Sequence, residues 1–383
     1  MNVALRDRVH MARALRLAAK GQGTTGPNPM VGAVVVKNGR IVGEGFHRYA
    51  GGPHAELLAL KQAGARAKGA TLYVTLEPCC HTEKRTPPCV PAVVAAGIAR
   101  VVAAMQDPNP RVSGRGLRAL RAAGVAVTVG CLRAEAEALN VLYGYRMKTG
   151  LPYVVLKAGM TLDGKIATAA GESQWITGPE ARRDAHRLRA EADAVLVGVD
   201  TVLHDDPQLT VRLPGRQAAK PARHPLRVIL DSRLRIPLSA RVLRAGDPAR
   251  KQSLPVGTLI LTTARAPRTK IARLQRMGVD VVVCPSDKGR VSFRAGLRHV
   301  AKIGVASVLA EGGSEVNATA VRSGLVNRVV LYLAPMLLGG QDAKGLIGGS
   351  SPTRLSRSLG LTIQRLRRLG SDVVIEAIPA KTR

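Results

Sequence analysis

Three potential metal ligands and one carboxylate fall within a single stretch of the chain, residues 54–89. The stretch begins with His54 and Glu56, continues with Cys79 directly after a Glu-Pro dipeptide, and closes with Cys89. One imidazole and two thiolates are a usual donor set for zinc, and three protein ligands leave a fourth position for water. Open sites of this kind are catalytic, whereas structural zinc sites normally close with four ligands. The pattern therefore predicts a catalytic zinc held by His54, Cys79 and Cys89, with Glu56 as the catalytic residue beside it.

Each of these residues, taken alone, has a structural alternative. A single histidine is commonly packed in a core, and a free cysteine commonly behaves as a small hydrophobe. The combination of His-x-Glu with Pro-Cys in one window favours the metal site over that alternative. This reasoning leaves the roles of Cys80 and His81 undecided, because either side chain could compete for the metal.

The pattern resembles the zinc deaminases, in which His-x-Glu is followed by Pro-Cys and a later cysteine. In those enzymes the metal polarises a water and the glutamate moves its protons. Their usual second half is Pro-Cys-x-x-Cys, but here Cys79 and Cys89 lie ten positions apart, with Arg-Thr-Pro-Pro before Cys89. That gap resembles the deaminase of riboflavin biosynthesis, which acts on a diaminopyrimidinone ribosyl phosphate. The resemblance makes Cys79 rather than Cys80 the ligand and places His81 at the mouth of the site.

Length and composition limit the number of domains and the cellular compartments that fit this chain. A chain of 383 residues is too long for one ordinary core and suggests two domains. It has no run of about 18 apolar residues, so we expect no membrane span. Five cysteines, three of them clustered near a histidine, indicate a reducing compartment, the cytoplasm.

The formal charge of +32 raises the hypothesis of nucleic-acid binding, but the basic residues are spread over the whole chain and aromatic residues make up only 2%. We therefore expect no nucleic-acid partner.

Apolar spacing and turn residues predict an alternating α/β domain at residues 1–148. Expected helices are 7–19, 54–63, 91–97, 114–123 and 134–148, and expected strands are 30–36, 41–45, 71–76, 101–105 and 125–129. His54 and Glu56 fall in the first turn of helix 54–63. The expected sheet-facing side chains of that helix are Leu57, Leu58 and Leu60, and the expected apolar face of helix 7–19 is Val9, Ala12, Leu15, Ala18 and Ala19.

Asn28, before strand 30–36, has two interpretations. It could be only a turn residue, because it stands between two prolines. However, Asn-Pro before this strand resembles the pyrimidine and purine deaminase superfamily, in which the asparagine contacts the substrate. That resemblance makes Asn28 a substrate-binding candidate.

A second domain is expected at residues 149–383, after a Thr-Gly-Leu-Pro boundary. Alternation of strands and helices favours a largely parallel sheet. Expected strands are 153–157, 194–199, 226–230, 258–262, 279–284, 307–310, 329–333 and 372–377, with helices 268–277 and 291–302 among them. We expect the segment between the last two strands to be loop-rich, and residues 214–224 and 244–255 to be exposed loops.

Three strings, residues 158–165, 171–177 and 201–212, resemble the reductase half of the bifunctional riboflavin-synthesis enzyme family. The resemblance spans essentially the whole chain. It implies an α/β protein with an N-terminal cytidine-deaminase-like three-layer domain and a C-terminal dihydrofolate-reductase-like domain. It also implies a nicotinamide dinucleotide lined by Gly159, Trp175, Thr201, Asp205 and Ser232. The implied substrate-binding residues are Ser173, Arg189, Leu209, Arg212 and Glu311. From spacing alone, Trp175 could equally be a core residue and Arg189 a solvated charge on a helix.

A pair of glycines, Gly312 and Gly313, lies between a strand and a helical stretch. Such a pair can let a dinucleotide phosphate approach exposed backbone N–H groups. The expected cofactor-binding residues here are Gly313, Ser314, Glu315, Val316, Asn317, Ala318 and Thr319. Because Gly-x-Gly-x-x-Gly is missing at this point, the sequence does not predict a Rossmann site.

We therefore expect a two-step enzyme of riboflavin biosynthesis. The first domain would deaminate 2,5-diamino-6-(5-phosphoribosylamino)pyrimidin-4(3H)-one, with Glu56 taking a proton from water and returning it to ammonia. The second would use NADPH to reduce the ribosyl side chain of 5-amino-6-(5-phosphoribosylamino)uracil to ribityl. The choice of NADPH over NADH and a homodimer formed through the reductase half are implied by the resemblance alone.

Two other functions are considered. An RNA or nucleoside deaminase would suit the positive charge, but it would leave residues 149–383 without a purpose. A non-catalytic regulatory protein of the same fold would be expected to have lost some site residues. The intact set of His54, Glu56, Cys79 and Cys89 argues against lost deamination.

Overall fold

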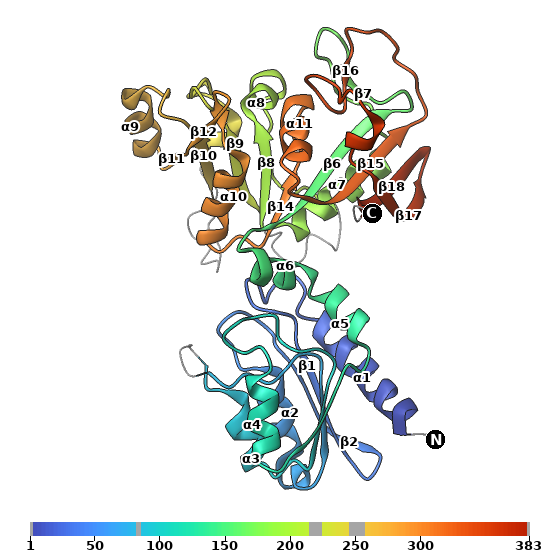
Figure 1. Ribbon diagram of the computed structural model, residues 1–383. Helices are drawn as coiled ribbons and strands as arrows, with labels where there is room; N and C mark the ends of the chain where they lie inside the picture. Colours follow the sequence, from blue (N-terminus) through green and yellow to red (C-terminus); the bar gives the residue numbers. More distant parts are fainter. Residues whose placement is uncertain (1–2, 82–85, 214–223, 245–256, 381–383) are drawn as a thin grey trace. The chain divides into compact units, whose positions relative to one another are not determined.

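A five-stranded sheet lies at the centre of the first half of the chain (Figure 1). The computed structural model describes residues 3–81, 86–213, 224–244 and 257–380. The chain divides into two compact units, Met1–Gly150 and Leu151–Arg383. This division falls two residues after the boundary expected from the sequence.

The first unit alternates strands and helices, as the sequence predicts. Its strands are β1 (Gly32–Lys37), β2 (Arg40–Phe46), β3 (Thr71–Val74), β4 (Arg100–Ala103) and β5 (Ala126–Val129). Its helices are α1 (Val3–Ala19), α2 (Ala55–Ala63), α3 (Cys89–Ala95), α4 (Arg115–Ala122), α5 (Arg133–Leu139) and α6 (Val141–Thr149), with a 3-10 turn at Gly64–Ala67. The single helix expected at 134–148 is divided at Asn140. The side chain of Asn140 instead bonds the backbone N–H and C=O of Met30, at 2.8 and 2.9 Å.

The strand order of this sheet is β2-β1-β3-β4-β5. Strands β2, β1 and β3 pair antiparallel, and β3, β4 and β5 pair parallel. Alternate residues of β1 face two separate cores, as the period of a strand requires. Ala33 and Val35 pack with α2, α3 and α4, whereas Val34 and Val36 pack with α1 and α5. The result is the expected three-layer arrangement.

The apolar face predicted for the first helix is only partly right. Ala18 is buried as predicted, but the other buried apolar residues are Met11, Ala14 and Leu17, and Val9 is 51% exposed. An ion pair accounts for this orientation: Asp7 accepts hydrogen bonds from Tyr73 on β3 and from Arg100 on β4. These bonds turn the Asp7 face of α1 toward the sheet.

The second unit contains a nine-stranded sheet in the order β11-β10-β9-β8-β14-β6-β15-β18-β17. Its strands are β6 (Tyr153–Thr161), β8 (Ala194–Gly198), β9 (Leu226–Leu230), β10 (Thr258–Thr262), β11 (Asp280–Val283), β14 (Ser307–Ala310), β15 (Val326–Ala334), β17 (Leu361–Leu369) and β18 (Asp372–Pro379). Two short pairs, β7 (Lys165–Ala167) with β16 (Lys344–Gly345) and β12 (Ser286–Asp287) with β13 (Arg290–Val291), lie outside it. The helices are α7 (Pro179–Glu191), α8 (Val199–Asp205), α9 (Arg268–Arg276), α10 (Phe293–Lys302) and α11 (Ser314–Arg322), with 3-10 turns at Arg241–Leu243 and Leu355–Arg357.

Most of this sheet is parallel, from β11 to β15, as predicted. The far edge differs, because β18 and β17 run antiparallel to their neighbours. The segment predicted to be loop-rich is so over residues 335–360, but the prediction is wrong for the part that forms β17. The expected loops at 214–224 and 244–255 fall almost entirely outside the described residues.

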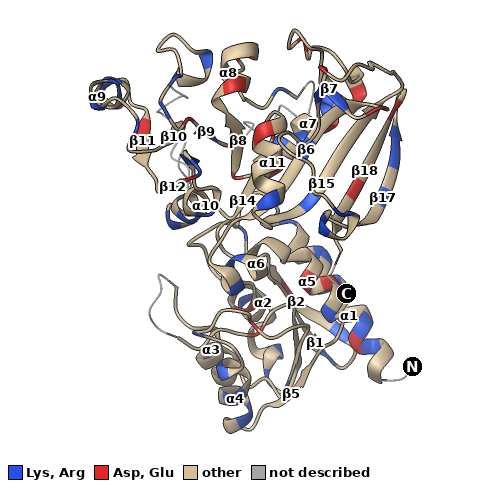
Figure 2. Cartoon of the chain, turned by 45° about the horizontal axis from the view of Figure 1, so that its top comes forward, with Lys and Arg blue, Asp and Glu red and all other residues tan. Residues whose placement is uncertain are grey.

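No helix among the described residues is long and apolar enough to cross a membrane. Basic side chains lie on elements of both units, including α1, α4, α9 and β17 (Figure 2). The large positive charge is therefore spread over the chain.

Candidate active sites

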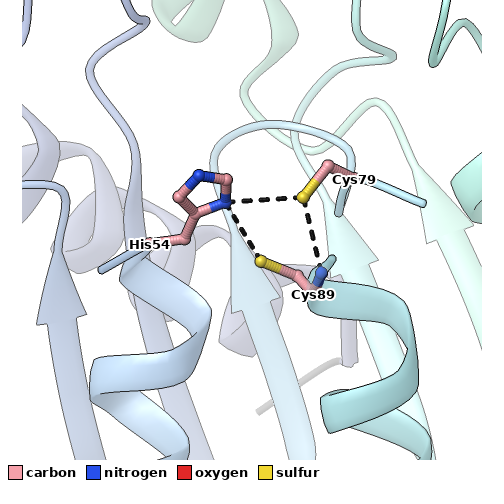
Figure 3. Close-up of side chains that lie close together, drawn as sticks. All are labelled: His54, Cys79 and Cys89. Carbon is pink, nitrogen blue, oxygen red and sulfur yellow. Dashed lines mark hydrogen bonds between the residues drawn. The ribbon is translucent and has the colours of Figure 1, made fainter. Parts of the chain in front are cut away.

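His54, Cys79 and Cys89 converge although they come from three separate segments (Figure 3). His54 is the N-cap of α2, Cys89 is the first residue of α3, and Cys79 lies in the loop that follows β3. The Nδ1 atom of His54 lies 3.2 Å from Cys89 Sγ and 3.4 Å from Cys79 Sγ. Both cysteines are buried, and the backbone N–H of Cys89 also donates to Cys79 Sγ at 3.4 Å.

This donor set fits zinc. One imidazole nitrogen and two thiol sulfurs lie within 4.8 Å of one another. Nitrogen and sulfur donors in this proportion suit a borderline-soft cation, and three of them leave a position for water. Within the described part of the chain, the donor group contains neither Cys80 nor His81. Among the three residues that the sequence left in competition, Cys79 is the one that lies with His54 and Cys89 in this group.

Glu56 lies one residue into α2, in the same turn that His54 caps. Its side chain is buried, with 3% of the residue exposed. Burial raises the pKa of Glu56, and the Cys79 charge raises that pKa further, while His54 opposes the shift. A carboxyl whose pKa moves toward neutrality is suited to taking up and returning a proton.

Two polar residues border the metal donors. The Nδ2 atom of Asn28 lies 3.2 Å from His47 Nε2, and His47 Nδ1 lies 3.1 Å from the carbonyl oxygen of Pro53. The rings of His47 and His54 meet edge to face at 5.6 Å. Asn28 is thus linked to the donor group through His47, a histidine that the sequence did not single out. Burial lowers the pKa of His47, which favours its neutral form.

A cavity of about 860 Å³ opens in the second unit, where β6, β8 and β14 meet the loops that follow them. It is lined by most residues predicted for the reductase. The cofactor candidates among its lining are Gly159, Trp175, Thr201, Asp205, Gly313, Ser314, Glu315 and Val316. The substrate candidates among its lining are Ser173, Arg189, Leu209, Arg212 and Glu311. Residues separated by more than 100 positions therefore meet in one cavity.

Trp175 is not a core residue. It is 64% exposed and lines the cavity, and the guanidinium carbon of Arg182 lies 4.6 Å from its ring centroid. A flat aromatic face at a cavity wall can pack against a cofactor or substrate ring. The core alternative for Trp175 is therefore excluded.

A buried ionic cluster forms part of the wall of this cavity. Arg189 on α7 pairs with Glu311, and Lys157 on β6 lines the same wall. Burial alone would raise the pKa of Glu311, but Arg189 and Lys157 together lower it. Burial also lowers the pKa of Lys157. The cluster holds more cations than carboxylates, so it is suited to an anionic group.

Comparisons with known proteins match both units. Residues 5–105 match the family described as the cytidine and deoxycytidylate deaminase zinc-binding region, and residues 152–375 match the RibD C-terminal domain. The riboflavin biosynthesis protein RibD of Escherichia coli (strain K12) is 44% identical across 98% of this chain and 100% of its own. That of Actinobacillus pleuropneumoniae is 42% identical, across 97% of this chain and 95% of its own. The chain belongs to the RibD family.

Solved structures agree with this assignment. RibD of Acinetobacter baumannii superposes with a TM-score of 0.86 at 37% identity, covering 99% of this chain and all of its own. A Thermotoga maritima protein, described as a diaminohydroxyphosphoribosylaminopyrimidine deaminase/5-amino-6-(5-phosphoribosylamino)uracil reductase, superposes with a TM-score of 0.80 at 34% identity and the same coverage. As a RibD-family member, this chain is a two-domain enzyme of riboflavin biosynthesis, a deaminase followed by a reductase.

The remaining cofactor candidates of this RibD-family chain lie elsewhere. Ser232 and Thr319 line a neighbouring cavity of about 390 Å³, together with Glu315 and Val316. Asn317 and Ala318 are fully buried on the inner face of α11. The Nδ2 atom of Asn317 donates to the carbonyl oxygen of Leu346, at 3.1 Å. The structure therefore does not bring these last two side chains to either cavity.

Sequence reasoning on this RibD-family chain missed His47, Lys157 and the basic residues that line the smaller cavity, which are Arg233, Arg235, Arg265, Lys288 and Arg290. His47 lies alone after a strand, and Lys157 lies inside an apolar strand, so neither has a local motif. The only sequence clue to Lys157 is a charge in the middle of a buried strand. Such a charge is uncommon without a partner and could have marked it as a functional candidate.

Proposed function

We propose that His54, Cys79 and Cys89 hold a catalytic zinc and that Glu56 moves the protons of the deamination. The proposed substrate is 2,5-diamino-6-(5-phosphoribosylamino)pyrimidin-4(3H)-one, whose exocyclic amine is hydrolysed. The observation that carries this assignment is the burial of Glu56 in the turn that His54 caps, with its pKa raised beside the donor group.

Each side chain has a distinct task in this step. When bound, zinc lowers the pKa of water and so supplies a nucleophile at neutral pH. A carboxylate Oε of Glu56 accepts a proton from that water and returns a proton to the departing ammonia. Asn28 and His47, linked to each other at 3.2 Å, orient the pyrimidine at the entrance. Burial of Cys79, Cys89 and Glu56 excludes bulk water from the reacting atoms.

The second unit, on this proposal, reduces the ribosyl side chain of 5-amino-6-(5-phosphoribosylamino)uracil to ribityl. A nicotinamide cofactor supplies the hydride, and the protein supplies the positions. Gly159, Trp175 and Thr201 line the cofactor side of the cavity, and Arg189 and Arg212 line the substrate side. Arginine forks are well matched to the substrate's phosphate.

We assign NADPH rather than NADH to this unit. The smaller cavity is lined by five basic residues, namely Arg233, Arg235, Arg265, Lys288 and Arg290. Asp200 pairs with Arg235, and Glu315 pairs with Arg290. Among described residues, the other three basic side chains have no carboxylate at ion-pair distance. Such a wall suits the extra phosphate of NADPH, which NADH lacks. The test is the ratio of kcat/KM for NADPH and NADH, and equal values would contradict the assignment.

We also propose that two copies associate through β17, which is the edge strand of the large sheet. Its Leu361, Ile363 and Leu366 are 42, 59 and 64% exposed, although an isolated edge strand normally avoids apolar side chains. Light scattering should give the mass of a dimer, and Ile363→Arg should give a monomer. A wild-type monomer at micromolar concentration would contradict this. None of the five cysteines forms a disulfide in the described structure, which suits a cytoplasmic enzyme, and cell fractionation can test this location.

The variant Glu56→Gln tests the deaminase assignment. It keeps the shape of the side chain but cannot cycle a proton. Ammonia release should fall by about 10²–10⁴-fold. Zinc content and the NADPH-dependent reduction of supplied deaminated substrate should stay at wild-type values.

Glu44→Gln is the matched control, because Glu44 lies on β2 and pairs with Arg13. It should leave both steps intact. If both steps fell equally in a folded Glu56→Gln protein, the assignment of two separate sites would be wrong.

A further inference from the structure

Glu77 is a buried carboxylate to which four backbone N–H groups donate. Only 3% of the residue is exposed. Its Oε2 accepts from Asp107 N at 3.1 Å and from Gly114 N at 2.8 Å. Its Oε1 accepts from Gly116 N at 2.9 Å and from Leu117 N at 3.3 Å. Charge-assisted bonds of this kind are stronger than neutral ones, so this contact is a firm anchor.

The four amides belong to one segment that is distant in sequence. It follows β4 and runs into the first turn of α4. Glu77 itself lies between β3 and Cys79, and its own N–H donates to Met105 O at 3.0 Å. The carboxylate therefore fastens the loop that carries Cys79 to the loop that follows the neighbouring parallel strand.

The backbones of the two loops also touch directly. A Cβ atom on Gly116 would lie 2.0 Å from the carbonyl oxygen of Pro78, the residue between Glu77 and Cys79. Only glycine permits this approach. The loop at Cys79 is thus held on one side by Gly116 and the amides bound to Glu77.

On its other side, Cys79 contacts α3. Its carbonyl oxygen accepts from Cys89 N at 3.0 Å and from Val90 N at 3.2 Å. Cys79 belongs to no helix or strand, so these two sets of contacts fix its position. We propose that Glu77 is a positioning residue for deamination, setting where Cys79 Sγ lies relative to His54 and Cys89. This inference rests on the proposed assignment of these three residues as zinc ligands.

The chemistry of the site requires a carboxylate. Two oxygens serve two pairs of N–H donors, one pair each. The amide of a glutamine offers one acceptor oxygen and one NH₂ group. In Glu77→Gln that NH₂ would face two N–H donors, which leaves them without an acceptor and forces the loops apart. Glu77→Asp keeps both acceptor oxygens on a shorter side chain.

The first experiment compares full-length wild-type protein with Glu77→Gln, Glu77→Asp and the control Glu44→Gln. We expect Glu77→Gln to lose about 10–100-fold in zinc affinity or in kcat for ammonia release. With Co²⁺ in place of zinc, its thiolate charge-transfer and d–d bands should shift. Glu77→Asp should lie between Glu77→Gln and wild type. Reduction should be unchanged in all four proteins.

The second experiment uses the unaltered protein, so it decides even if Glu77→Gln does not fold. If Glu77 couples Cys79 to the 107–117 loop, removing zinc must also loosen that loop, because coupling is reciprocal. Hydrogen exchange of peptides covering 107–117 should speed up on zinc removal by at least tenfold. Peptides from α1, in the same unit, should change far less.

The outcomes separate this inference from the proposed function. Wild-type protein that releases ammonia without zinc would contradict the ligand assignment itself. If wild type depends on zinc, unchanged exchange at 107–117 would overturn the role of Glu77. So would a folded Glu77→Gln protein with wild-type zinc affinity, cobalt spectrum and kcat. A lower Tm with no spectral change would show that Glu77 stabilises the fold only, and would also overturn it.

Discussion

Arg189 donates to both carboxylate oxygens of Glu311, at 2.5 Å to Oε2 and 3.4 Å to Oε1. The pair joins α7 to the end of β14, and the side chains are only 13% and 8% exposed. A third bond, from Arg189 to the carbonyl oxygen of Thr210 at 2.9 Å, fixes the guanidinium further. Arg189 is therefore a preorganised cation in the wall of the reductase cavity, not a solvated helix charge.

Removing one member of this pair should cost stability as well as activity. Arg189→Met leaves Glu311 buried without its partner, which typically destabilises by about 3–5 kcal/mol. The double variant Arg189→Met/Glu311→Gln removes the stranded charge and should recover most of that loss. Reduction should stay impaired in both variants, because the cation proposed to bind the substrate's phosphate is missing. Urea unfolding and NADPH oxidation measure the two effects, and a double variant as unstable as the single one would contradict the argument.

Zinc removal should separate the two activities. His54, Cys79 and Cys89 form the proposed metal site, and their donor atoms all lie within 4.8 Å of one another. Treatment with a strong chelator should abolish ammonia release, and added Zn²⁺ should restore it. Reduction of deaminated substrate, assayed in the same sample, provides the control and should persist. Ammonia release that survives complete zinc loss would exclude the metal mechanism.

Cofactor choice should depend on the basic wall of the smaller cavity. Arg233 lines it, whereas Arg268 on α9 is exposed and lines neither cavity. Arg233→Gln should raise KM for NADPH about tenfold, the value of one charge-assisted contact, and leave KM for NADH unchanged. Arg268→Gln is the matched control and should change neither. Equal increases for both cofactors would place Arg233 outside phosphate recognition.

His186 should make the second unit less stable in mild acid. Burial, with Arg189 and Arg212 nearby, lowers its pKa from 6.5 to about 4, and its Nδ1 accepts from Arg212 N at 3.3 Å. Between pH 6.5 and pH 4 the unfolded chain binds a proton that the folded chain does not, so stability falls as pH falls.

The ring is only about half buried, so the expected loss at pH 5 is reduced by solvent screening to about 1 kcal/mol relative to pH 7.5. His186→Gln should remove this part of the pH dependence. Urea unfolding followed by the fluorescence of Trp175, the single tryptophan of the chain, reports on this unit. The same acid loss in both proteins would assign it to other groups.

What could be predicted from the sequence depended on how local the chemistry is. The candidate metal donors are rare residue types concentrated in residues 54–89, so type and order were enough to predict them. The amides around Glu77 lie 30 to 40 positions away and carry no side-chain information. Backbone groups have no sequence pattern, so this contact could be found only in the fold.

The element that the sequence predicted wrongly has a similar explanation. Strand β17 contains Arg365, Arg367 and Arg368, which read as a polar loop. It forms a strand because β18 supplies its hydrogen bonds, and because Arg367 pairs with Asp184 and Glu376. An edge strand tolerates such charges. Tertiary partners, not local preference, decide these residues.

The packing of α2 on the sheet is a further feature that the sequence predicted only in part, and it gives the last prediction. The sequence predicts that Leu57, Leu58 and Leu60 face the sheet, and Leu60 is buried as predicted. Leu57 and Leu58 are only half-buried, however, and the other buried residues of the helix include Ala55 and Ala59. Gly43 on β2 allows this close approach, because a Cβ there would lie 2.1 Å from Ala59 O. Since α2 carries Glu56 and is capped by His54, the distance at which it packs on the sheet sets the positions of both residues in the proposed deaminase site.

Gly43→Ala should therefore push α2 off the sheet. Overpacking of this kind typically costs about 1–3 kcal/mol, and a clash with backbone rather than a flexible side chain places it at the upper end. Ammonia release should fall with it, and reduction should not. Gly144→Ala is the matched control, because Gly144 lies in α6 with nothing within 4 Å of an added Cβ. That change should be neutral or stabilise by up to about 1 kcal/mol. Urea unfolding and an ammonia assay measure both variants, and equal behaviour would mean that α2 tolerates a wider seat than the contact distances imply.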